Sequence, residues 1–125
     1  MKAKFMLGFL MLLFAGMANS TSSQQSEINE IEKALAKGYQ GQRNLAYGYA
    51  HGWGKPGDSD YLPQDNIKSC AWRKIIIISN HEQLDSSDFG NESIDCKNIN
   101  PADNEKVWEL VFAGLSLVKQ SKDSH

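Results

Sequence analysis

Apolar side chains recur every three or four positions along several stretches of the chain, and this spacing places them on one face of an α-helix. The first stretch predicts a helix that begins at Ser26, a residue type that often caps helices. Its apolar stripe consists of Ile28, Ile31, Leu35 and Tyr39. Gly38 and Gly41 weaken the end of this helix and mark the break before the next element.

The stretch of residues 44–80 contains two more helical patterns on either side of a turn-rich middle. The first runs from Asn44 to His51, and the second opens at Asp65, a favourable helix cap. The stripe of the second consists of Ile67, Cys70, Ala71, Ile75 and Ile78. The run of isoleucines at residues 75–78 favours a strand through its β-branched side chains. No second strand candidate stands out, so we expect a central helix covered from several sides, with a strand as the alternative.

The C-terminal part of the chain predicts one more helix, with Asn100 as its cap and Pro101 at its first position. Its buried stripe consists of Val107, Leu110, Val111, Leu115 and Val118, joined by Trp108 and Phe112. The preceding residues 81–98 are polar and rich in turn formers, so we expect a long loop there. The whole pattern predicts a small all-α domain in which a helical hairpin is flanked by an N-terminal and a C-terminal helix.

The hairpin residues resemble one unit of the Sel-one-like repeat, a relative of the tetratricopeptide repeat. The matching positions are Leu45, Ala46, Tyr49, Gly52, Gly54, Pro63, Gln64, Asp65, Lys68, Ala71 and Trp72. The chain carries a single copy, with residues Lys55 to Tyr61 inserted between the two helices. The resemblance implies two closely packed helices with the small Ala71 at their contact. It also implies a protein-interaction module whose repeat unit has no catalytic residues.

The first 20 residues predict a secretory signal peptide. Lys2 and Lys4 precede an apolar run, and Ala18, Asn19 and Ser20 offer the small residues that a signal peptidase reads. The apolar run is shorter than the roughly 20 residues that span a bilayer, so we expect no stable membrane insertion after the signal is removed. Residues 21–125 are then expected to form a single domain in the bacterial periplasm or outside the cell.

The chain has two cysteines, and an even number in an exported protein favours a disulfide. A bridge between Cys70 and Cys96 closes a loop of about 26 residues, worth about 3.5 kcal/mol in the chain-entropy model. Neither cysteine has the Cys-x-x-Cys spacing of a redox or zinc site. Two free thiols are the alternative.

Charge and motif content argue against several classes of function. The chain has 13 basic and 15 acidic side chains, and removal of Lys2 and Lys4 leaves 11 basic ones and a net charge of −4. Without a block of basic residues, this charge argues against nucleic acid as the partner. The three histidines lack metal-binding spacing, and no glycine-rich phosphate loop is present. We therefore predict no catalytic, cofactor-binding or metal-binding residues.

The candidate residues for binding a protein partner lie at the insertion. Trp53 stands at its entrance, and Asp58, Asp60 and Tyr61 follow within it. An aromatic anchor with a charged rim is common at binding hot spots, and an acidic rim favours a basic partner. Alternatively, Trp53 folds back over the end of the hairpin.

These features predict a non-catalytic, exported protein-binding module, an adaptor or scaffold whose partner is another protein. One alternative is an immunity protein that neutralises a toxin acting in the periplasm, because such proteins are often small, exported and acidic, and some carry this repeat. A less favoured alternative is a small hydrolase in which an Asp or Glu acts together with His51.

Overall fold

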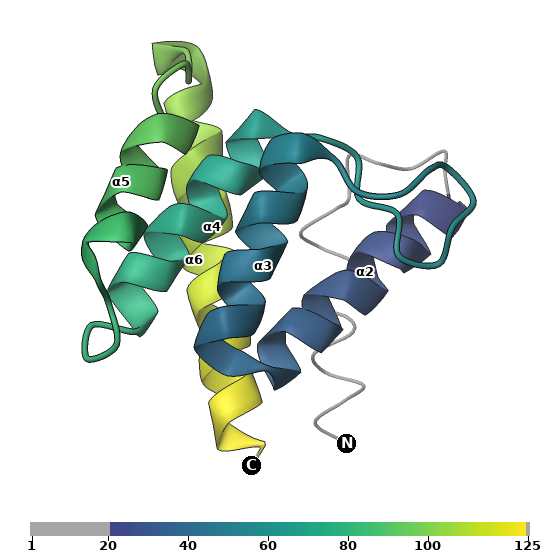
Figure 1. The fold of residues 1–125 in the computed structure, drawn as a ribbon, viewed down its shortest axis with the longest axis horizontal. Helices are drawn as coiled ribbons and strands as arrows, with labels where there is room; N and C mark the ends of the chain where they lie inside the picture. Colours follow the sequence, from purple (N-terminus) through teal and green to yellow (C-terminus); the bar gives the residue numbers. More distant parts are fainter. Residues whose placement is uncertain (1–20, 125) are drawn as a thin grey trace.

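The computed structural model describes residues 21–124, which form five α-helices (Figure 1). The helices are α2 (Thr21–Ala36), α3 (Gly38–His51), α4 (Asn66–Ser79), α5 (Ser86–Asp95) and α6 (Pro101–Asp123). The predicted all-α fold is therefore confirmed. The signal peptide predicted for residues 1–20 lies outside the described residues and stays a prediction.

Helices α3 and α4 pack against each other as an antiparallel pair. At one end of the pair, the backbone N–H of Asp65 donates to the carbonyl oxygen of Tyr49 at 2.8 Å. At the other end, Asn80 Nδ2 donates to Gln42 Oε1, also at 2.8 Å. The later residue of α4 meets the earlier residue of α3, so the two helices run in opposite directions. Asp65 caps α4 as predicted, because its carboxylate accepts the backbone N–H of Lys68 at 3.0 Å.

The boundary between α2 and α3 differs from the predicted one. The helical structure is interrupted before Gly38, whose φ of +68° suits glycine, and α3 begins at this residue rather than at Asn44. Tyr39 and Gly41 therefore belong to α3. A Cβ atom at Gly41 would lie 2.2 Å from the carbonyl oxygen of Ala34, so glycine is required here for a close approach of the two helices. The pattern misplaced the boundary because it read both glycines as helix breakers.

Helix α2 begins at Thr21, so Ser26 lies inside it and is not its cap. The Ser26 hydroxyl lies 2.8 Å from the carbonyl oxygen of Tyr61, which belongs to the loop between α3 and α4. Glu27, the next residue along the helix, is fully buried. The predicted stripe of Ile28, Ile31 and Leu35 is buried in the core.

Helix α4 is the central helix and contacts α3, α5 and α6. All four isoleucines of residues 75–78 lie within it, so the strand alternative is wrong. Ile75 and Ile76 are buried, whereas Ile78 is 48% exposed. The prediction that this helix is covered from several sides is confirmed for the first two isoleucines and wrong for the last.

Helix α6 packs along α4. Its buried residues are Val107, Val111, Gly114, Leu117, Val118 and Ser121. A Cβ atom at Gly114 would lie 2.3 Å from Ile75 Cδ1, which shows how closely the helices approach. Trp108 and Phe112, expected to join the buried stripe, are 38% and 65% exposed. Each follows a buried valine by one residue, which turns its side chain by about 100° around the helix axis.

Helix α5 lies within residues 81–98, where a loop was expected. Its start is defined by a capping box: Asp85 accepts backbone N–H groups of the first turn, and Asp88 accepts the backbone N–H of Asp85 at 3.1 Å. Asp88 is the only buried residue of this helix. With no apolar stripe facing the core, the hydrophobic pattern could not reveal a helix here.

The attachment of α5 to α4 is covalent and polar. The predicted disulfide joins Cys70 and Cys96, with a Cα–Cα distance of 4.8 Å. Arg73 Nε lies 2.8 Å from Asp95 Oδ2. The next residue, Lys74, forms an ion pair with Glu92, which precedes Asp95 by about one turn of α5. A disulfide is typical of an oxidising compartment. Within the described part of the chain, no helix is long and apolar enough to cross a membrane.

Candidate functional site

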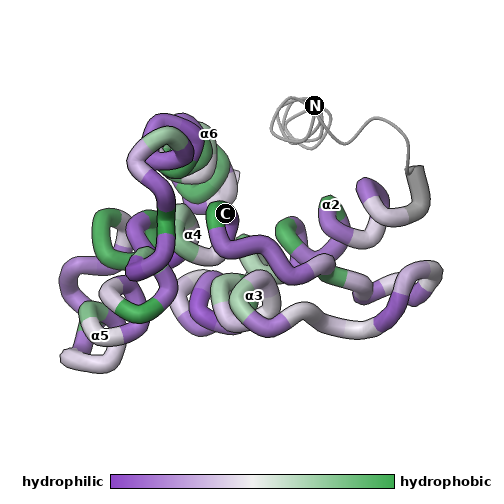
Figure 2. The backbone as a smooth tube through the Cα atoms, turned by 90° about the horizontal axis from the view of Figure 1, so that it is seen from above, coloured by the Kyte–Doolittle hydropathy of each residue, from purple (hydrophilic) through white to green (hydrophobic). Residues whose placement is uncertain are grey.

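The loop of residues 52–65 lies beside α2, at the opposite end of the molecule from α5 (Figures 1 and 2). Two backbone hydrogen bonds between Trp53 and Leu62, of 2.9 and 2.8 Å, form an antiparallel bridge that closes it. Gly54 and Gly57, with φ of +71° and +101°, provide the turns inside it. This loop has a defined backbone conformation.

The carboxylates predicted to form an acidic rim hold the loop together. Asp58 Oδ2 accepts the backbone N–H of Lys55 at 2.9 Å, and Asp60 Oδ2 accepts the indole N–H of Trp53 at 3.0 Å. Trp53 is 43% exposed. The Trp53 indole is thus both accessible and fixed by a charge-assisted hydrogen bond.

The loop packs onto α3 at a glycine. A Cβ atom at Gly48 would lie 2.8 Å from Leu62 Cδ1 and 3.8 Å from an atom of the Trp53 ring. Leu62 is buried, and the Trp53 ring lies against the helix with part of its surface open to solvent. The expectation of an exposed Trp53 and the alternative of a ring folded back onto the hairpin are therefore both partly met.

A pocket of about 140 Å³ lies between α2, α3 and this loop. Its lining residues are Glu30, Lys33, Ala34, Lys37, Gly41, Asn44, Leu45, Trp53 and Leu62. The apolar members come from all three elements; the charged members are Glu30 and Lys33 of α2 and Lys37, which lies between α2 and α3. The volume is on the order of a cavity that admits a benzene ring, so the pocket suits one apolar side chain.

The charged side chains of the pocket differ in their partners. Lys33 Nζ lies 2.8 Å from Glu30 Oε2, and this hydrogen bond raises the pKa of the Lys33 ammonium group. Lys37 follows one helical turn later and is exposed. Its ammonium group is therefore available at the rim of the pocket.

A second polar cluster lies in the core and joins three helices. Glu27 Oε2 of α2 accepts hydrogen bonds from the Tyr49 hydroxyl of α3 and from Lys68 Nζ of α4, each at 3.0 Å. Glu27 is fully buried, and burial, with the Glu27 carboxylate beside it, raises the pKa of Tyr49 well above its ordinary value. None of the three lines the pocket. The cluster connects the helices that surround it.

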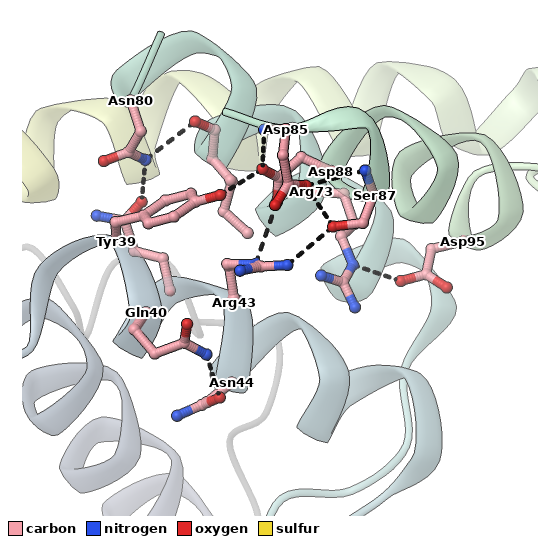
Figure 3. A network of polar contacts seen from close by, with 12 residues as sticks. Tyr39, Gln40, Arg43, Asn44, Arg73, Asn80, Asp85, Ser87, Asp88 and Asp95 are labelled. Atoms are coloured by element: carbon pink, nitrogen blue, oxygen red, sulfur yellow. Dashed lines mark hydrogen bonds and ion pairs between the residues drawn. The ribbon is translucent and has the colours of Figure 1, made fainter. Parts of the chain in front are cut away.

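A third polar cluster attaches α5 to α3 (Figure 3). The Tyr39 hydroxyl donates to the buried Asp88 carboxylate, and this hydrogen bond raises the pKa of Tyr39. Arg43 Nε lies 3.2 Å from the other oxygen of Asp88, an ion pair without hydrogen-bond alignment. The Arg43 guanidinium also donates to Ser87 Oγ at 3.0 Å. These contacts give Asp88 a structural role at the junction of the two helices.

The residues matched to the repeat lie in α3, in α4 and in the loop between them. Leu45, Ala46, Tyr49, Lys68, Ala71 and Trp72 are buried; Gly52 and Gly54 have positive φ; Pro63, Gln64 and Asp65 lead into α4. Among all predicted site residues, only Leu45 and Trp53 line the pocket. Tyr61 is half-buried, and its carbonyl oxygen contacts α2.

Sequence reasoning missed the contribution of α2 to this site. Lys33 and Lys37 share a helix face because they are four residues apart, and that spacing was visible in the sequence. Their approach to Asn44 and Leu62 was not visible, because it depends on the close contact of α2 and α3 at Gly41.

His51 contacts the residue one turn before it in α3. His51 Nδ1 lies 3.0 Å from the carbonyl oxygen of Tyr47, and its ring stacks on the Tyr47 ring at 4.1 Å between centroids. Within residues 21–124, no group of three or more His, Cys, Asp or Glu side chains is placed to hold a metal ion. The two contacts with Tyr47 give His51 a structural role at the C-terminal end of α3.

The chain matches no protein-family model, no curated protein and no solved structure. The resemblance to the Sel-one-like repeat therefore rests on the hairpin residues alone. A functional proposal has to rest on the geometry of the pocket and its loop.

Proposed function

We propose that the protein is a non-catalytic, exported protein-binding module of the Sel-one-like type, an adaptor or scaffold that recognises its partner through the pocket beside the loop of residues 52–65. The observation that supports this proposal is a preformed pocket of single-side-chain size with a half-exposed tryptophan in its wall. The disulfide supports an oxidising, extracytoplasmic compartment.

The loop prepares Trp53 for binding before any partner arrives. Its hydrogen bond to Asp60 and its packing on Gly48 restrict the indole. A side chain that is ordered in advance loses less conformational entropy on association. Tryptophan is also among the residue types most enriched at hot spots, where truncation costs about 2 kcal/mol or more of affinity.

The proposal is tested by capture of the partner. The full chain, produced in its native host with a C-terminal affinity tag, is purified without reductant and its bound proteins are identified. Trp53→Ala is compared with Trp108→Ala, which removes a similarly exposed indole from α6. We expect Trp53→Ala to weaken binding of the captured protein about 30-fold, and Trp108→Ala to leave it unchanged.

Both variants must first show unchanged melting and an intact disulfide. Equal binding by the parent and by folded Trp53→Ala would overturn the proposal that recognition uses this pocket. The identity of the partner separates the two binding roles considered from the sequence. A secreted toxin that loses activity in the complex would make the module an immunity protein, and any other partner would favour an adaptor.

A further inference from the structure

The pocket has opposite charges at its two ends. Helix α2 runs along it, and Ser26 of that helix contacts Tyr61 at the end where Asp60 lies. Lys37 lies at the other end, next to Gly41 of α3. Asp60 accepts the indole N–H of Trp53 in the pocket wall, and its carboxylate also contributes to raising the pKa of Lys33, one helical turn before Lys37.

The middle of the pocket is nearly neutral and largely apolar. Glu30 and Lys33 pair with each other there. The apolar wall consists of Ala34, Leu45, Trp53 and Leu62. An occupant that matches this surface has an apolar group at its centre, a cation toward the aspartates and an anion toward Lys37.

We infer that the pocket binds an extended peptide segment of the partner in which one apolar side chain lies between a basic and an acidic residue. This inference rests on the proposed function and specifies the chemistry of the partner. In an extended chain, side chains two positions apart point to the same face, so charged residues on either side of the apolar one can reach the same surface. The two charged residues then lie about two positions before and after the apolar one.

The hydrogen bonds that Asp58 and Asp60 make inside the loop are compatible with this role. Each carboxylate accepts from an uncharged N–H group, so these hydrogen bonds bring no positive charge to it. Asp58 is exposed. Its charge adds to that of Asp60 at the same end of the pocket, where it attracts a basic side chain.

The test uses synthetic peptides and the isotopically labelled protein purified with its disulfide intact. The first probe carries phenylalanine at its centre, lysine two positions before it and glutamate two positions after it; a second has the charges exchanged. There are three control peptides. One has alanine in place of phenylalanine, one has lysine at both charged positions, and one has glutamate at both. Binding is followed by the NMR shifts of the Trp53 indole N–H and the backbone amides of Gly41 and Asn44.

We expect one of the two oppositely charged peptides to bind with a Kd on the order of 0.1–1 mM. The alanine control should bind at least about tenfold more weakly, because the apolar contact is lost. The two like-charged controls should bind about three- to tenfold more weakly, with a smaller difference at high salt. Equal binding of the like-charged and oppositely charged peptides overturns the inference, as does the absence of any shift.

Two variants connect the peptide result to the pocket. Lys37→Glu should shift the preference toward the peptide with lysine at both ends, whereas Lys119→Glu, on the exposed side of α6, should change nothing. Asn44→Phe should fill the mouth of the pocket and abolish binding of every peptide. Unchanged peptide preference in folded Lys37→Glu overturns the inference.

Failure of this inference is distinguishable from failure of the proposed function. A partner captured by the parent and lost by Trp53→Ala, but held equally by Lys37→Glu, leaves the binding role standing and refutes the charge pattern. A partner held equally by parent and Trp53→Ala refutes the use of the pocket itself.

Discussion

Replacement of Gly41 by alanine is expected to destabilise the protein, although alanine is the better helix former. In an exposed helix interior this change gains about 1 kcal/mol. Here the new Cβ atom would lie 2.2 Å from the carbonyl oxygen of Ala34 and 2.7 Å from the Cβ atom of Lys37. The first of these is a backbone atom, so relief requires α2 to move away from α3. Overpacking of this kind costs about 1–3 kcal/mol, and we expect a net loss of about 2 kcal/mol.

Gly90→Ala in α5 is the matched control. It changes the same residue type within a helix, and nothing lies within 4 Å of the position of its new Cβ atom. We expect a gain of about 0.5–1 kcal/mol. Gly114→Ala should fall between them, because its Cβ meets the flexible end of the Ile75 side chain.

The three variants and the parent are compared by urea unfolding, followed by far-ultraviolet circular dichroism without reductant. Equal slopes in denaturant show that differences in midpoint report stability. The expected gap of about 3 kcal/mol between the Gly41 and Gly90 variants greatly exceeds the error of the method. A Gly41→Ala protein as stable as the parent would show that α2 and α3 do not pack this closely, and the pocket between them would lose its basis.

Four further outcomes are expected. Ala71→Leu should lower the unfolding free energy by about 1–3 kcal/mol, because Ala71 is buried in the core, whereas Ala36→Leu at an exposed position should change it little; urea midpoints check both. Glu27→Gln should cost about 3–5 kcal/mol, because it removes the buried carboxylate that pairs with Lys68 and accepts from Tyr49, whereas exposed Glu32→Gln should stay within about 0.5 kcal/mol; equal midpoints would refute the buried ion pair. Reduction of the disulfide should lower stability by about 3.5 kcal/mol, and thiol titration of the unreduced, denatured protein should find no reactive thiol. Because the pKa of Tyr49 is raised in the folded state, the neutral hydroxyl contributes to folding stability fully below the unfolded pKa of about 10, and this stability is lost as pH rises above it. Tyr49→Phe should reduce the alkaline loss of stability in melting experiments.

Most of the helical architecture could be predicted because each long helix buries a continuous stripe. Helices α4 and α6 follow their apolar spacing, and Asp65 caps α4 where the sequence placed a cap. The disulfide was expected from the even number of cysteines and the predicted export. Even the four isoleucines could be assigned, because the helical stripe continued through them from Ile67. In these elements local preference and burial point to the same structure.

The remaining parts were not predictable because their stabilising contacts are polar and distant in sequence. Helix α5 is attached through the disulfide, the ion pair of Arg73 with Asp95 and the buried Asp88, and neither aspartate contributes to a hydrophobic period. Glu27 finds its partner Lys68 on another helix 41 residues away. A periodic pattern assigns such charged residues to solvent, and only the assembled fold shows them paired.

The pocket illustrates the same limit at the candidate site. Helix α2 lies close to α3 at Gly41 and tilts away from it toward the loop (Figure 1). The loop of residues 52–65 covers the space between them by placing Leu62 and Trp53 against Gly48. Trp53 and Leu62, which lie on either side of the insertion of residues Lys55 to Tyr61, thus cover one side of α3. The pocket is the part of this space that the loop leaves unfilled, so its lining combines α2, a helix outside the resemblance, with two loop residues that are not among the matched positions. Its specificity must therefore be sought in this chain's own lysines and aspartates, because Leu45 is the single matched residue in the lining.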